Sequence, residues 1–530
     1  MTEHMINSDN TSLGIELGST RIKAVLIGPD KTPLATGNYD WENQYIDGVW
    51  TYSLEDIWEG MRGSYADLKA SVRDTYHVEL HKIGALGISG MMHGYLAFNA
   101  ESQLLTPFRT WRNTFTEEAS SKLSEKFDFN IPQRWSIAHL YQAILNGEDH
   151  LPDLQHLTTL AGYVHWQLTG EQVLGVGEAS GVFPIDTARG QFNERMMNQF
   201  NDLIADHGFA WTVADVLPAV RSAGEEAGKL TQRGAQLLDP SGDLEAGVPF
   251  CPPEGDAGTG MVATDSVAPR TGNISAGTSI FGMVVLENEL KKRHDELDIV
   301  TTPAGDQVAM VHCNNGASEI DAWAGIFQEF ALQFDANADS SRVFQTLFTA
   351  AEQSERDAGG LVSYNYLSGE HITGFEQGRP LVVRRPGRDF TLGNFMRSQL
   401  YATFATLRLG MDILTIEEGV EVDTLLAHGG MFKTKGVAQS LLAGALNVAV
   451  TVADTASEGG AWGIAVLADF TRSKKRVDGM KLGEYLTQEV FVDTAFETEQ
   501  PVDADVQGFN QFFAAWKQGL AVERAAVENL

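Results

Sequence analysis

The sequence predicts an α/β protein built from two similar halves. Residues 13–27, LGIELGSTRIKAVLI, resemble residues 272–286, GNISAGTSIFGMVVL, and each copy is typical of a strand, a tight turn of glycine and hydroxyl residues, and a second strand. Short apolar strands alternate elsewhere with longer segments of helical period, as in α/β domains. One such hairpin would be an ordinary turn, but two copies that each open about half of the chain favour duplicated domains.

The elements follow in order from each hairpin. In the first half, a strand over 83–89 runs into Gly90-Met91-Met92-His93-Gly94. In the second half, a strand over 424–427 runs into His428-Gly429-Gly430 and is followed by a helix around 437–446 and a strand over 448–453. The first half ends shortly after Asp256, so we expect domains at 1–266 and 267–530, the second with a C-terminal helical extension.

That extension carries one apolar helical stripe, formed by Phe509, Phe512, Phe513, Trp516 and Leu520. We favour core packing for the stripe, with a partner interface as the alternative.

Charge and composition exclude several classes of protein. The 530 residues include 38 basic and 71 acidic side chains, a formal net charge of -33, which disfavours nucleic-acid and anionic-membrane partners. Cys251 and Cys313 are too few for a disulfide framework and indicate a reducing compartment. The polar N-terminus, MTEHMINSDN, does not resemble a secretory signal, and no apolar run approaches the roughly 18 residues of a membrane span. We therefore expect a cytoplasmic protein.

Three glycine turns follow predicted strands, at 18–20, 277–279 and 429–430. The sequence has no GxxxxGK[ST] motif and no GxGxxG between a strand and a helix, which excludes P-loop and Rossmann sites. Turns of this kind leave backbone N–H groups free to bind phosphate oxygens. Three of them suit a polyphosphate ligand.

Asp256 is the leading candidate for a catalytic base. It follows the strand at 248–251 and the segment CPPEGD, and it precedes the helix-compatible AGTGMVAT, so we expect it at a strand-to-helix junction where α/β proteins bind ligands. The alternative is a helix N-cap. Glu16 in the first hairpin could be a solvent-facing strand residue, but beside a phosphate-binding turn it would require Mg²⁺ between the two negative groups.

Two polar loops, Met92-His93-Gly94 and Trp111-Arg112-Asn113, combine an aromatic ring with imidazole and amide groups. This combination suits a polyhydroxylated ligand. Each loop alone is nonspecific, because a single histidine can be structural and tryptophan usually packs in the core.

Taken together, these segments resemble the FGGY family of carbohydrate kinases, within the actin, hexokinase and Hsp70 superfamily of ATPases, from about residue 12 to about residue 490. The resemblance rests on GIELGSTRIKAVL, ISGMMHG, RTWRNT, HWQLTGE, GVGEASGVFPID, PEGDAGTG, NISAGTS, YLSGEH and LAHGGMFKTKGVAQSLLAGALNVAV. MMHG is similar to the QMHG loop of the xylulokinase branch. The resemblance implies two ribonuclease H-like, actin-like ATPase domains with a cleft between them, which close on their substrates.

The resemblance also implies transfer of the γ-phosphoryl group of ATP to a terminal sugar hydroxyl, with Asp256 as the base and Mg²⁺ near Glu16 and Asp256. The implied ATP-binding residues are Gly18, Ser19, Thr20, Lys23, Gly277, Thr278 and Ser279 for the phosphates, and Gly429, Gly430, Met431 and Thr434 for the adenosine. The implied sugar-binding residues are Met92, His93, Trp111, Asn113 and Asp256.

Several positions depart from the family pattern. Glu16 replaces an aspartate, Ala257 replaces the asparagine after the base, WRNT replaces WNDGR, and His139 stands where the family carries lysine. These changes leave the sugar open: we expect D-xylulose first, with ribulose, another ketose or a polyol as alternatives. The resemblance further suggests a homodimer.

Two other classes of function stay open from the sequence. One is a non-catalytic binding protein that responds to sugar or nucleotide, since a fold alone does not define an activity. The other is a chaperone-like or filament-like ATPase, against which MMHG, RTWRNT and YLSGEH argue.

Overall fold

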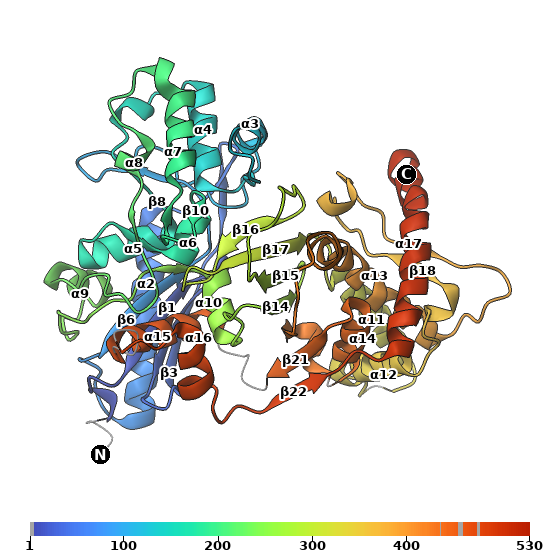
Figure 1. Ribbon diagram of the computed structural model, residues 1–530. Helices are drawn as coiled ribbons and strands as arrows, with labels where there is room; N and C mark the ends of the chain where they lie inside the picture. Colours follow the sequence, from blue (N-terminus) through green and yellow to red (C-terminus); the bar gives the residue numbers. More distant parts are fainter. Residues whose placement is uncertain (1–4, 336, 435, 454–458, 474–477) are drawn as a thin grey trace. The chain divides into compact units, whose positions relative to one another are not determined.

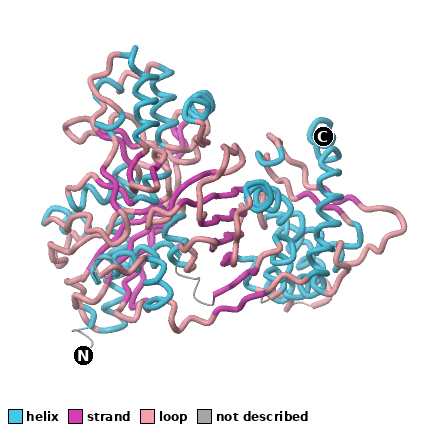
Figure 2. The backbone as a smooth tube through the Cα atoms, viewed as in Figure 1, coloured by secondary structure: helices cyan, strands magenta, loops and turns pink. Residues whose placement is uncertain are grey.

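The computed structural model describes the whole chain except residues 1–4, 336, 435, 454–458 and 474–477 (Figure 1). Contacts divide the chain into two units, each a mixture of helices and strands (Figure 2). The first comprises Met1–Val267, Ile299–Val308 and Thr455–Asp493, and the second comprises Ala268–Asp298, Ala309–Asp454 and Thr494–Leu530. The first boundary, between Val267 and Ala268, lies one residue from the expected division between 266 and 267. The chain then returns to the first unit twice, and the sequence did not predict these two returns.

The first unit is built on a five-stranded sheet in the order β13-β6-β1-β2-β3. Strand β1 (Ser12–Leu17) pairs antiparallel with β2 (Arg21–Ile27) and parallel with β6 (Ala85–Gly90). β3 (Pro33–Asp40) is antiparallel to β2, and β13 (Glu254–Gly255) is parallel to β6. The predicted hairpin and the strand that follows it are confirmed.

Helices cover both faces of this sheet. The register places Gly14 of β1 and Gly37 of β3 on opposite faces. A Cβ at Gly37 would lie 2.2 Å from the Ser64 carbonyl oxygen of α2 (Leu54–Tyr76), and one at Gly14 would lie 2.0 Å from the Ala461 carbonyl oxygen of α15 (Gly459–Ser473). Because both faces are covered, β1, β2 and β6 are almost continuously apolar and buried.

Smaller elements complete the first unit. Its paired short strands are β4 (Gln44–Ile46) with β5 (Val49–Thr51), β7 (Leu96–Phe98) with β8 (His156–Thr158), β9 (Val173–Gly175) with β12 (Ala219–Arg221), and β10 (Ile185–Asp186) with β11 (Gln191–Phe192). Its other helical elements are α3 (Glu117–Phe127), α4 (Ser136–Asn146), η1 (Leu151–Asp153), α5 (Leu160–Thr169), α6 (Val176–Ser180), α7 (Glu194–Ile204), η2 (Ala205–His207), α8 (Val213–Val216), α9 (Gln232–Leu238), α10 (Asp256–Ala263), α16 (Leu482–Tyr485) and η7 (Leu486–Val490).

The second unit repeats the central topology of the first. A seven-stranded sheet has the order β16-β17-β15-β14-β20-β21-β22, in which β14 is antiparallel to β15 and parallel to β20, as β1 is to β2 and β6. The internal repeat in the sequence therefore corresponds to a structural duplication. Most of β16 and the first residues of β17 fall within the segment 299–308 that is assigned to the first unit. The strands are β14 (Thr271–Ala276), β15 (Ile280–Val285), β16 (Asp298–Thr301), β17 (Gln307–Cys313), β20 (Thr424–Gly429), β21 (Ala449–Ala453) and β22 (Phe496–Glu499).

Helices surround this second sheet. They are α11 (Ser318–Leu332), α12 (Ser340–Glu352), α13 (Leu392–Asp412), α14 (Val437–Leu446) and α17 (Asp503–Asn529), with the short elements η3 (Ala358–Gly360), η4 (His371–Thr373), η5 (Ile413–Glu418) and η6 (Gly430–Lys433) and the strand pair β18 (Val362–Tyr364) and β19 (Leu381–Val383). Four aromatic residues of the C-terminal stripe are buried, which favours the core-packing interpretation: Phe509, Phe512, Phe513 and Trp516.

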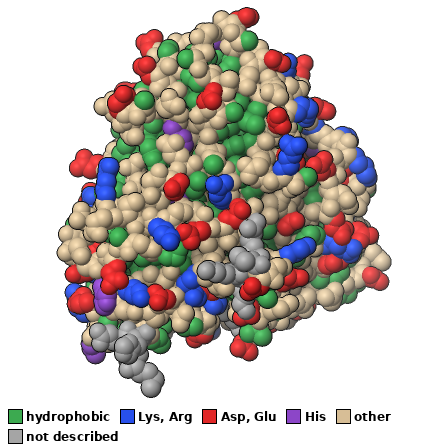
Figure 3. All heavy atoms as spheres, turned by 60° about the vertical axis from the view of Figure 1, so that its left-hand side comes forward, with side chains coloured by type: hydrophobic (Ala, Val, Ile, Leu, Met, Phe, Trp, Pro, Cys, Tyr) green, Lys and Arg blue, Asp and Glu red, His purple; other side chains and the backbone are tan. Residues whose placement is uncertain are grey.

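Charged side chains, the two cysteines and the apolar character of the helices bear on the partners that were considered. Acidic side chains are spread over the face shown in Figure 3, with basic ones between them. Cys251 and Cys313 are both buried and free. Among the described residues, no helix has the length and apolar character needed to span a membrane.

The contact between β1 and α15 predicts a stability effect. We expect Gly14→Ala to lower the free energy of unfolding by about 3 kcal/mol, because the new methyl group would overlap backbone atoms that cannot rotate away. Urea denaturation measures the change. Gly260→Ala, within α10, is the control: no described atom lies within 4 Å of its added Cβ, so we expect a gain of up to about 1 kcal/mol from helix propensity. Equal stability of the two variants would contradict the packing.

Candidate active site

Asp256 lies where β13 ends and α10 begins, as the sequence predicted. The N-cap of α10 is Gly255, and Asp256 is the first helical residue, so the N-cap alternative is wrong. The Asp256 Oδ1 accepts hydrogen bonds from the backbone N–H groups of Met92, at 3.3 Å, and Ala257, at 3.0 Å. The side chain is exposed, so these bonds orient the carboxylate and leave Oδ2 available to a ligand.

The environment of Asp256 increases its basicity. The side chain reaches solvent, but the protein packed around its base removes part of its hydration, and this burial raises the pKa of Asp256. The N–H groups of Met92 and Ala257 oppose the increase because they stabilise the charged form. A carboxylate with a raised pKa accepts a proton more readily at neutral pH, which suits a general base.

Glu16 is held at the start of α15 and is only partly exposed, so it is not a simple solvent-facing strand residue. Its Oε2 accepts a hydrogen bond from the Ala461 N–H at 3.2 Å. A Cβ at Gly460 would lie 2.3 Å from its Oε1, so glycine is needed for this approach. Burial, and then the negative charge of Asp256, raise the pKa of Glu16 to about 7, against the opposing effects of the Ala461 N–H and Lys23.

The electrostatic interaction of Glu16 with Asp256 shows that the two predicted metal-binding carboxylates lie in the same region of the first unit. The described residues contain no cluster of three or more histidine, cysteine, aspartate or glutamate side chains arranged to hold a metal ion. Mg²⁺ is commonly bound by one or two carboxylates together with water and substrate phosphates. The donor set of Glu16 and Asp256 therefore fits Mg²⁺ that arrives with a nucleotide.

Two further carboxyl groups, those of Glu254 and Glu178, lie near Asp256, and neither was predicted from the sequence. Glu254 is buried and its carboxylate accepts hydrogen bonds from the Gly177 N–H at 3.4 Å and the Glu178 N–H at 2.8 Å. Burial raises the pKa of Glu254 to about 8 and raises the pKa of the fully buried Glu178 well above its usual range. Glu254 therefore holds its proton near pH 7, and the raised pKa of Glu178 acts in the same direction, which limits the negative charge around Asp256. The segment PEGD, in which Glu254 stands two residues before Asp256, was the feature of the sequence that could have pointed to Glu254.

The first predicted phosphate turn, Gly18-Ser19-Thr20, is fixed from behind by two aromatic residues. The Trp41 Nε1–H donates to the Gly18 carbonyl oxygen at 2.7 Å, and the Tyr52 hydroxyl donates to the Ser19 carbonyl oxygen at 2.6 Å. The two rings stack with centroids 4.1 Å apart. The Gly18 N–H is also used within the protein, since it donates to the Arg21 carbonyl oxygen at 3.0 Å, so a ligand at this turn would have to meet the other N–H groups of the turn. Neither Trp41 nor Tyr52 was predicted from the sequence.

The second phosphate turn, Gly277-Thr278-Ser279, is fixed in the same way by different groups. The Gly316 N–H donates to the Thr278 carbonyl oxygen at 2.7 Å, and the Ala317 N–H donates to the Gly277 carbonyl oxygen at 2.8 Å. Each unit thus contributes one hairpin turn whose carbonyl groups are bonded to its own backbone or side chains.

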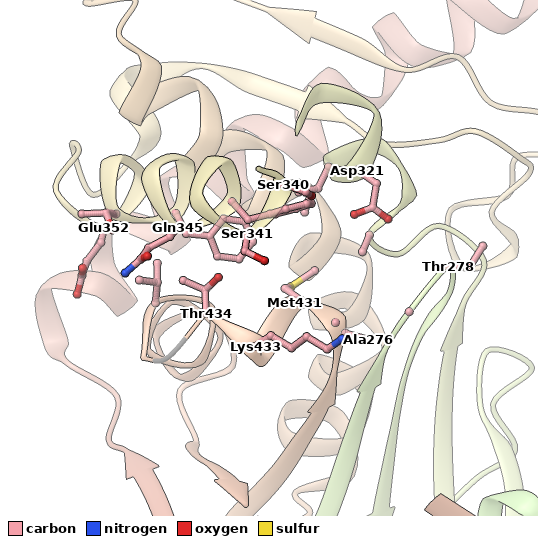
Figure 4. Close-up of a pocket in the computed structure, with 18 residues that line it drawn as sticks. Ala276, Thr278, Asp321, Ser340, Ser341, Gln345, Glu352, Met431, Lys433 and Thr434 are labelled. Carbon is pink, nitrogen blue, oxygen red and sulfur yellow. The ribbon is translucent and has the colours of Figure 1, made fainter. Parts of the chain in front are cut away.

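A cavity of about 800 Å³ adjoins this second turn (Figure 4). Side chains of α12 lie on one side of it and those of Met431, Lys433 and Thr434 on the other, with Thr278 and Asp321 toward one end. The predicted ATP-binding residues that line it are Gly277, Thr278, Gly430, Met431 and Thr434, whereas Ser279 and Gly429 do not. The predicted residues Gly18, Ser19, Thr20 and Lys23 belong to the first unit.

The contribution of α12 to the cavity was not predicted. Seven of its residues line the wall: Ser340, Ser341, Phe344, Gln345, Phe348, Thr349 and Glu352. Their helical spacing was the only sequence signal, and an ordinary amphipathic helix gives the same signal.

Met92 and His93 are held beside the base. The backbone N–H of Met92 is one of the two donors to Asp256. His93 has a positive φ of 68°, its Nδ1 lies 3.1 Å from the Gly181 carbonyl oxygen, and its ring stacks on Trp135 with centroids 6.2 Å apart. The strained backbone and the stacking fix this loop against the end of α6, next to Asp256.

Asn113 does not have the ligand-facing environment that was predicted. Its side chain is buried: Oδ1 accepts from the Trp50 N–H at 2.9 Å, and Nδ2 donates to the carbonyl oxygens of Trp50 at 2.9 Å and Thr110 at 3.0 Å. Both amide hydrogens are therefore used within the protein, and Asn113 holds its loop against β5. Trp111 in the same loop is 39% exposed and so remains accessible.

His139 is fully buried, and burial, with smaller effects from Arg109 and His93, lowers its pKa to about 3. The position where the family carries a lysine is therefore uncharged in this protein near neutral pH.

The duplicated α/β units, the repeated hairpin turns and the carboxylate at the start of a helix are what a phosphotransferase of the actin-like ATPase fold requires. Family models give the same class: the FGGY family of carbohydrate kinases, N-terminal domain, matches residues 11–263, and its C-terminal domain matches residues 272–471. The chain belongs to the FGGY family of carbohydrate kinases. It is thus an ATP-using enzyme that transfers a phosphoryl group to an alcohol acceptor.

Individual relatives are distant. The chain is 22% identical over 369 residues to a xylulose kinase of Escherichia coli, covering 68% of this chain and 69% of the relative. It is 21% identical over 374 residues to a xylulose kinase of Klebsiella pneumoniae, with 68% and 69% coverage.

Solved structures of several sugar kinases share the fold. A xyloylose kinase from Brucella ovis superimposes with a TM-score of 0.77 at 19% identity over 98% of this chain and 99% of that one. A gluconate kinase from Lactobacillus acidophilus gives 0.77 at 15% identity over 97% and 98%. A glycerol kinase from Plasmodium falciparum with ADP gives 0.74 at 15% identity over 97% and 98%. These neighbours act on different acceptors, so their fold does not identify the sugar.

The raised pKa of Glu16 predicts a pH-dependent effect on stability. Because its folded pKa, about 7, lies above the ordinary value of 4.5, Glu16 contributes stability that is present below pH 4.5 and is lost as pH rises through 7. We expect the stability of Glu16→Gln relative to the wild type, in metal-free buffer, to increase by about 3 kcal/mol between pH 4 and pH 8. Thermal unfolding at the two pH values measures this, and a constant difference would contradict the shift.

The environment of Asn113 predicts a structural effect. We expect Asn113→Ala to lower the free energy of unfolding by about 2 to 3 kcal/mol, because backbone groups of Trp50 and Thr110 lose their partners. Arg112→Ala in the same loop removes an exposed guanidinium 4.1 Å from the Trp50 ring centroid and should cost about 1 kcal/mol or less. Urea denaturation compares the two. Unchanged stability of Asn113→Ala with a raised KM for the acceptor would support the original ligand-binding prediction.

Proposed function

We propose that this FGGY kinase phosphorylates a ketopentose, D-xylulose first, at its terminal hydroxyl to give D-xylulose 5-phosphate. The observation that carries the proposal is the environment of Asp256: exposed, oriented by two N–H groups and beside the Met92-His93 loop. The relatives named xylulose kinase support the sugar, and the resemblance of MMHG to a xylulokinase loop agrees. Ribulose, another ketose or a polyol remain alternatives, since gluconate and glycerol kinases share the fold.

In the proposed reaction, Asp256 removes a proton from the sugar hydroxyl. Its Oδ1 stays bonded to the Met92 and Ala257 N–H groups, and its Oδ2 accepts the proton. The hydroxyl oxygen forms a bond to the γ-phosphorus as the bond from that phosphorus to the β,γ-bridging oxygen breaks, and ADP leaves with that oxygen. The raised pKa of Asp256 makes it a better proton acceptor for an alcohol than an ordinary aspartate.

Glu16 and Asp256 would hold Mg²⁺, which neutralises charge between the phosphates when it is bound with ATP. Glu16 is longer than the aspartate usual in the family, and its Oε2 is bonded to the Ala461 N–H, so its reach toward the cation is set by the start of α15. We assign phosphate contacts to Lys23 and to the N–H groups of both hairpin turns other than those of Gly18 and Gly277, which donate to the carbonyl oxygens of Arg21 and Ser279. We place the adenosine in the cavity beside Gly430, Met431 and Thr434.

For the acceptor, we assign contacts to Met92, His93 and Trp111. The exposed Trp111 ring offers an apolar surface for the carbon face of a sugar, and His93 can bond a hydroxyl. Asn113 supports their loop. Ala257 lacks the amide usual in the family at that position, so one acceptor hydroxyl would have no partner there, which can change the preferred epimer by about 1 to 3 kcal/mol.

We place the enzyme in the cytoplasm. Its two cysteines are buried thiols without a disulfide, and ATP and sugar phosphates are intracellular metabolites of the reaction proposed here.

The role of Asp256 predicts a selective loss of turnover. We expect Asp256→Asn to lower kcat by about two to four orders of magnitude, with sugar binding retained, because the amide cannot accept the proton. A coupled assay of ADP release measures kcat, and calorimetry measures sugar binding. Asp202→Asn, on the exposed surface of α7, is the control and should keep wild-type turnover.

The same assay, run across pentuloses, hexuloses and polyols, identifies the acceptor. Sugar-dependent ADP release that is greatest with D-xylulose is the expected result, and a greater rate with another acceptor would replace the sugar but retain the mechanism. Near-normal turnover of Asp256→Asn would refute the role of the base. Binding of sugar and nucleotide with no ADP release would favour a non-catalytic binding protein.

A further inference from the structure

The segment YLSGEH, residues 366–371, takes no part in the reaction described above, but it is bonded to Asn315, two residues beyond the end of β17. The Asn315 Oδ1 accepts hydrogen bonds from the N–H groups of Leu367 at 2.9 Å and Ser368 at 3.0 Å. The Glu370 Oε2 accepts two bonds from Asn315, one from its backbone N–H at 3.2 Å and one from its Nδ2 at 3.1 Å. Glu370 is 0% exposed, and Asn315 is buried as well. The two segments are therefore joined inside the second unit.

The residues that follow Asn315 support the second phosphate turn. The N–H groups of Gly316 and Ala317 donate to the carbonyl oxygens of Thr278 and Gly277. A Cβ at Gly316 would lie 2.4 Å from the Gly277 carbonyl oxygen, so the chain passes in contact with the turn and leaves no room for a side chain. Ala317 and the first turn of α11 line the same cavity as Gly277 and Thr278 (Figure 4). The position of this short segment therefore determines the position of the turn and of one end of the cavity.

Side chains hold Asn315 and Gly316 in place, because these two residues belong to no helix or strand. The Asn365 Nδ2 donates to the carbonyl oxygens of Asn315 and Gly316, each at 3.0 Å, and the Thr403 hydroxyl donates to that of Gly316 at 3.2 Å. Asn365 and Thr403 are both buried. Glu370 is the charged group among these partners, and a hydrogen bond to a charged acceptor is stronger than one between neutral groups.

We propose that Glu370 is a positioning residue for the nucleotide, which acts through Asn315 and Gly316 to hold the second phosphate turn and the start of α11 in place. Because its side chain is fully buried, Glu370 acts without touching the nucleotide. This role depends on the phosphate contacts proposed above for the N–H groups of Thr278 and Ser279. Groups that bind phosphate must be held at fixed positions, so a small displacement of the turn weakens binding.

The burial of the Glu370 carboxyl group is itself costly, which calls for a compensating interaction. Burial raises the pKa of Glu370 to about 7, against the opposing effect of its hydrogen bonds with Asn315. The Glu370 Oε1 is buried, forms no hydrogen bond with a described residue and lies 3.6 Å from the His371 Nδ1. An apolar side chain would be less costly at this position, but it could not hold Asn315.

Calorimetric titration with ADP and Mg²⁺ tests the role, together with the KM values for ATP and for the acceptor in the assay of ADP release. We expect Glu370→Ala to raise the Kd for ADP and the KM for ATP by roughly 10-fold, because Asn315 loses its charged partner. The KM for the acceptor should change by less than about twofold, because the proposed acceptor residues belong to the first unit. Glu370→Gln keeps an oxygen that can accept from Asn315 but lacks the charge, so it should raise the Kd for ADP by only about threefold.

Glu523 on α17 provides the matched control. It is another fully buried carboxyl group of the same unit. Its Oε1 accepts a hydrogen bond from the Arg379 N–H at 2.6 Å, and its Oε2 forms none with a described residue. We expect Glu523→Ala and Glu523→Gln to lower the melting temperature about as much as the Glu370 variants do, and to leave the Kd for ADP unchanged.

The outcomes separate positioning from stability. A Kd for ADP in Glu370→Ala that stays near the wild-type value, or that changes no more than in Glu523→Ala, would overturn the positioning role. If Glu370→Ala does not fold, Glu370→Gln decides: a raised Kd for ADP supports the role, and a wild-type Kd overturns it.

The ADP titration contains no acceptor, so its result stands whichever sugar the enzyme phosphorylates. Unchanged ADP binding in a Glu370→Ala protein that still phosphorylates its acceptor would remove the positioning role and leave the proposed reaction intact. Weakened ADP binding in Glu370→Ala, with no turnover of any acceptor by the wild type, would support the positioning role and contradict the proposed reaction.

Discussion

The first unit depends on the close approach of α15 to the central sheet. Gly14 lets the helix backbone lie against β1, and Gly460 makes room for the Glu16 carboxylate at the start of the helix. The helix N–H group at Ala461 stabilises that carboxylate, whereas burial and Asp256 destabilise its charge. One contact thus joins the packing of the sheet to the electrostatics of the site. A divalent cation at this position would relieve the unfavourable charge of Glu16.

The two phosphate turns reach the same geometry through different neighbours. Trp41 and Tyr52 bind the carbonyl groups of the first turn, and backbone N–H groups of Gly316 and Ala317 bind those of the second. A duplicated hairpin can therefore keep its shape while the residues that support it diverge. This accounts for an internal repeat that is visible over only about 15 residues in each half.

Several features could be predicted because they depend on residues close together in the sequence. The similarity of the two hairpin sequences predicted the duplication. The segments PEGD and AGTG predicted that Asp256 lies between a strand and a helix. Other features depend on contacts between distant segments. The return of α15 to the first unit, the α12 wall of the cavity and the buried Glu178 have no local pattern that distinguishes them from ordinary helices.

Asn113 shows the limit of reading a loop by residue type. An amide beside tryptophan and arginine suits a sugar, but the same donors and acceptors suit backbone groups, and the structure uses them for Trp50 and Thr110. Which of these an amide serves depends on burial, and neighbouring residues do not reveal burial. His139 is similar, since only its enclosure makes it uncharged.

The discontinuous first unit constrains how such enzymes can recombine. Residues 299–308 also belong to it: the Thr301 N–H donates to the Ser180 hydroxyl at 3.0 Å, and the Ala223 N–H donates to the Pro303 carbonyl oxygen at 2.8 Å. A gene cut once between the halves would deprive the sheet of α15 and expose the glycine-lined groove of β1 and β6. A chimaera that combines whole halves of two family members would therefore pair the sheet of one protein with the α15 of another, and the two would not pack well. Acceptor preference can change more easily by substitutions within loops.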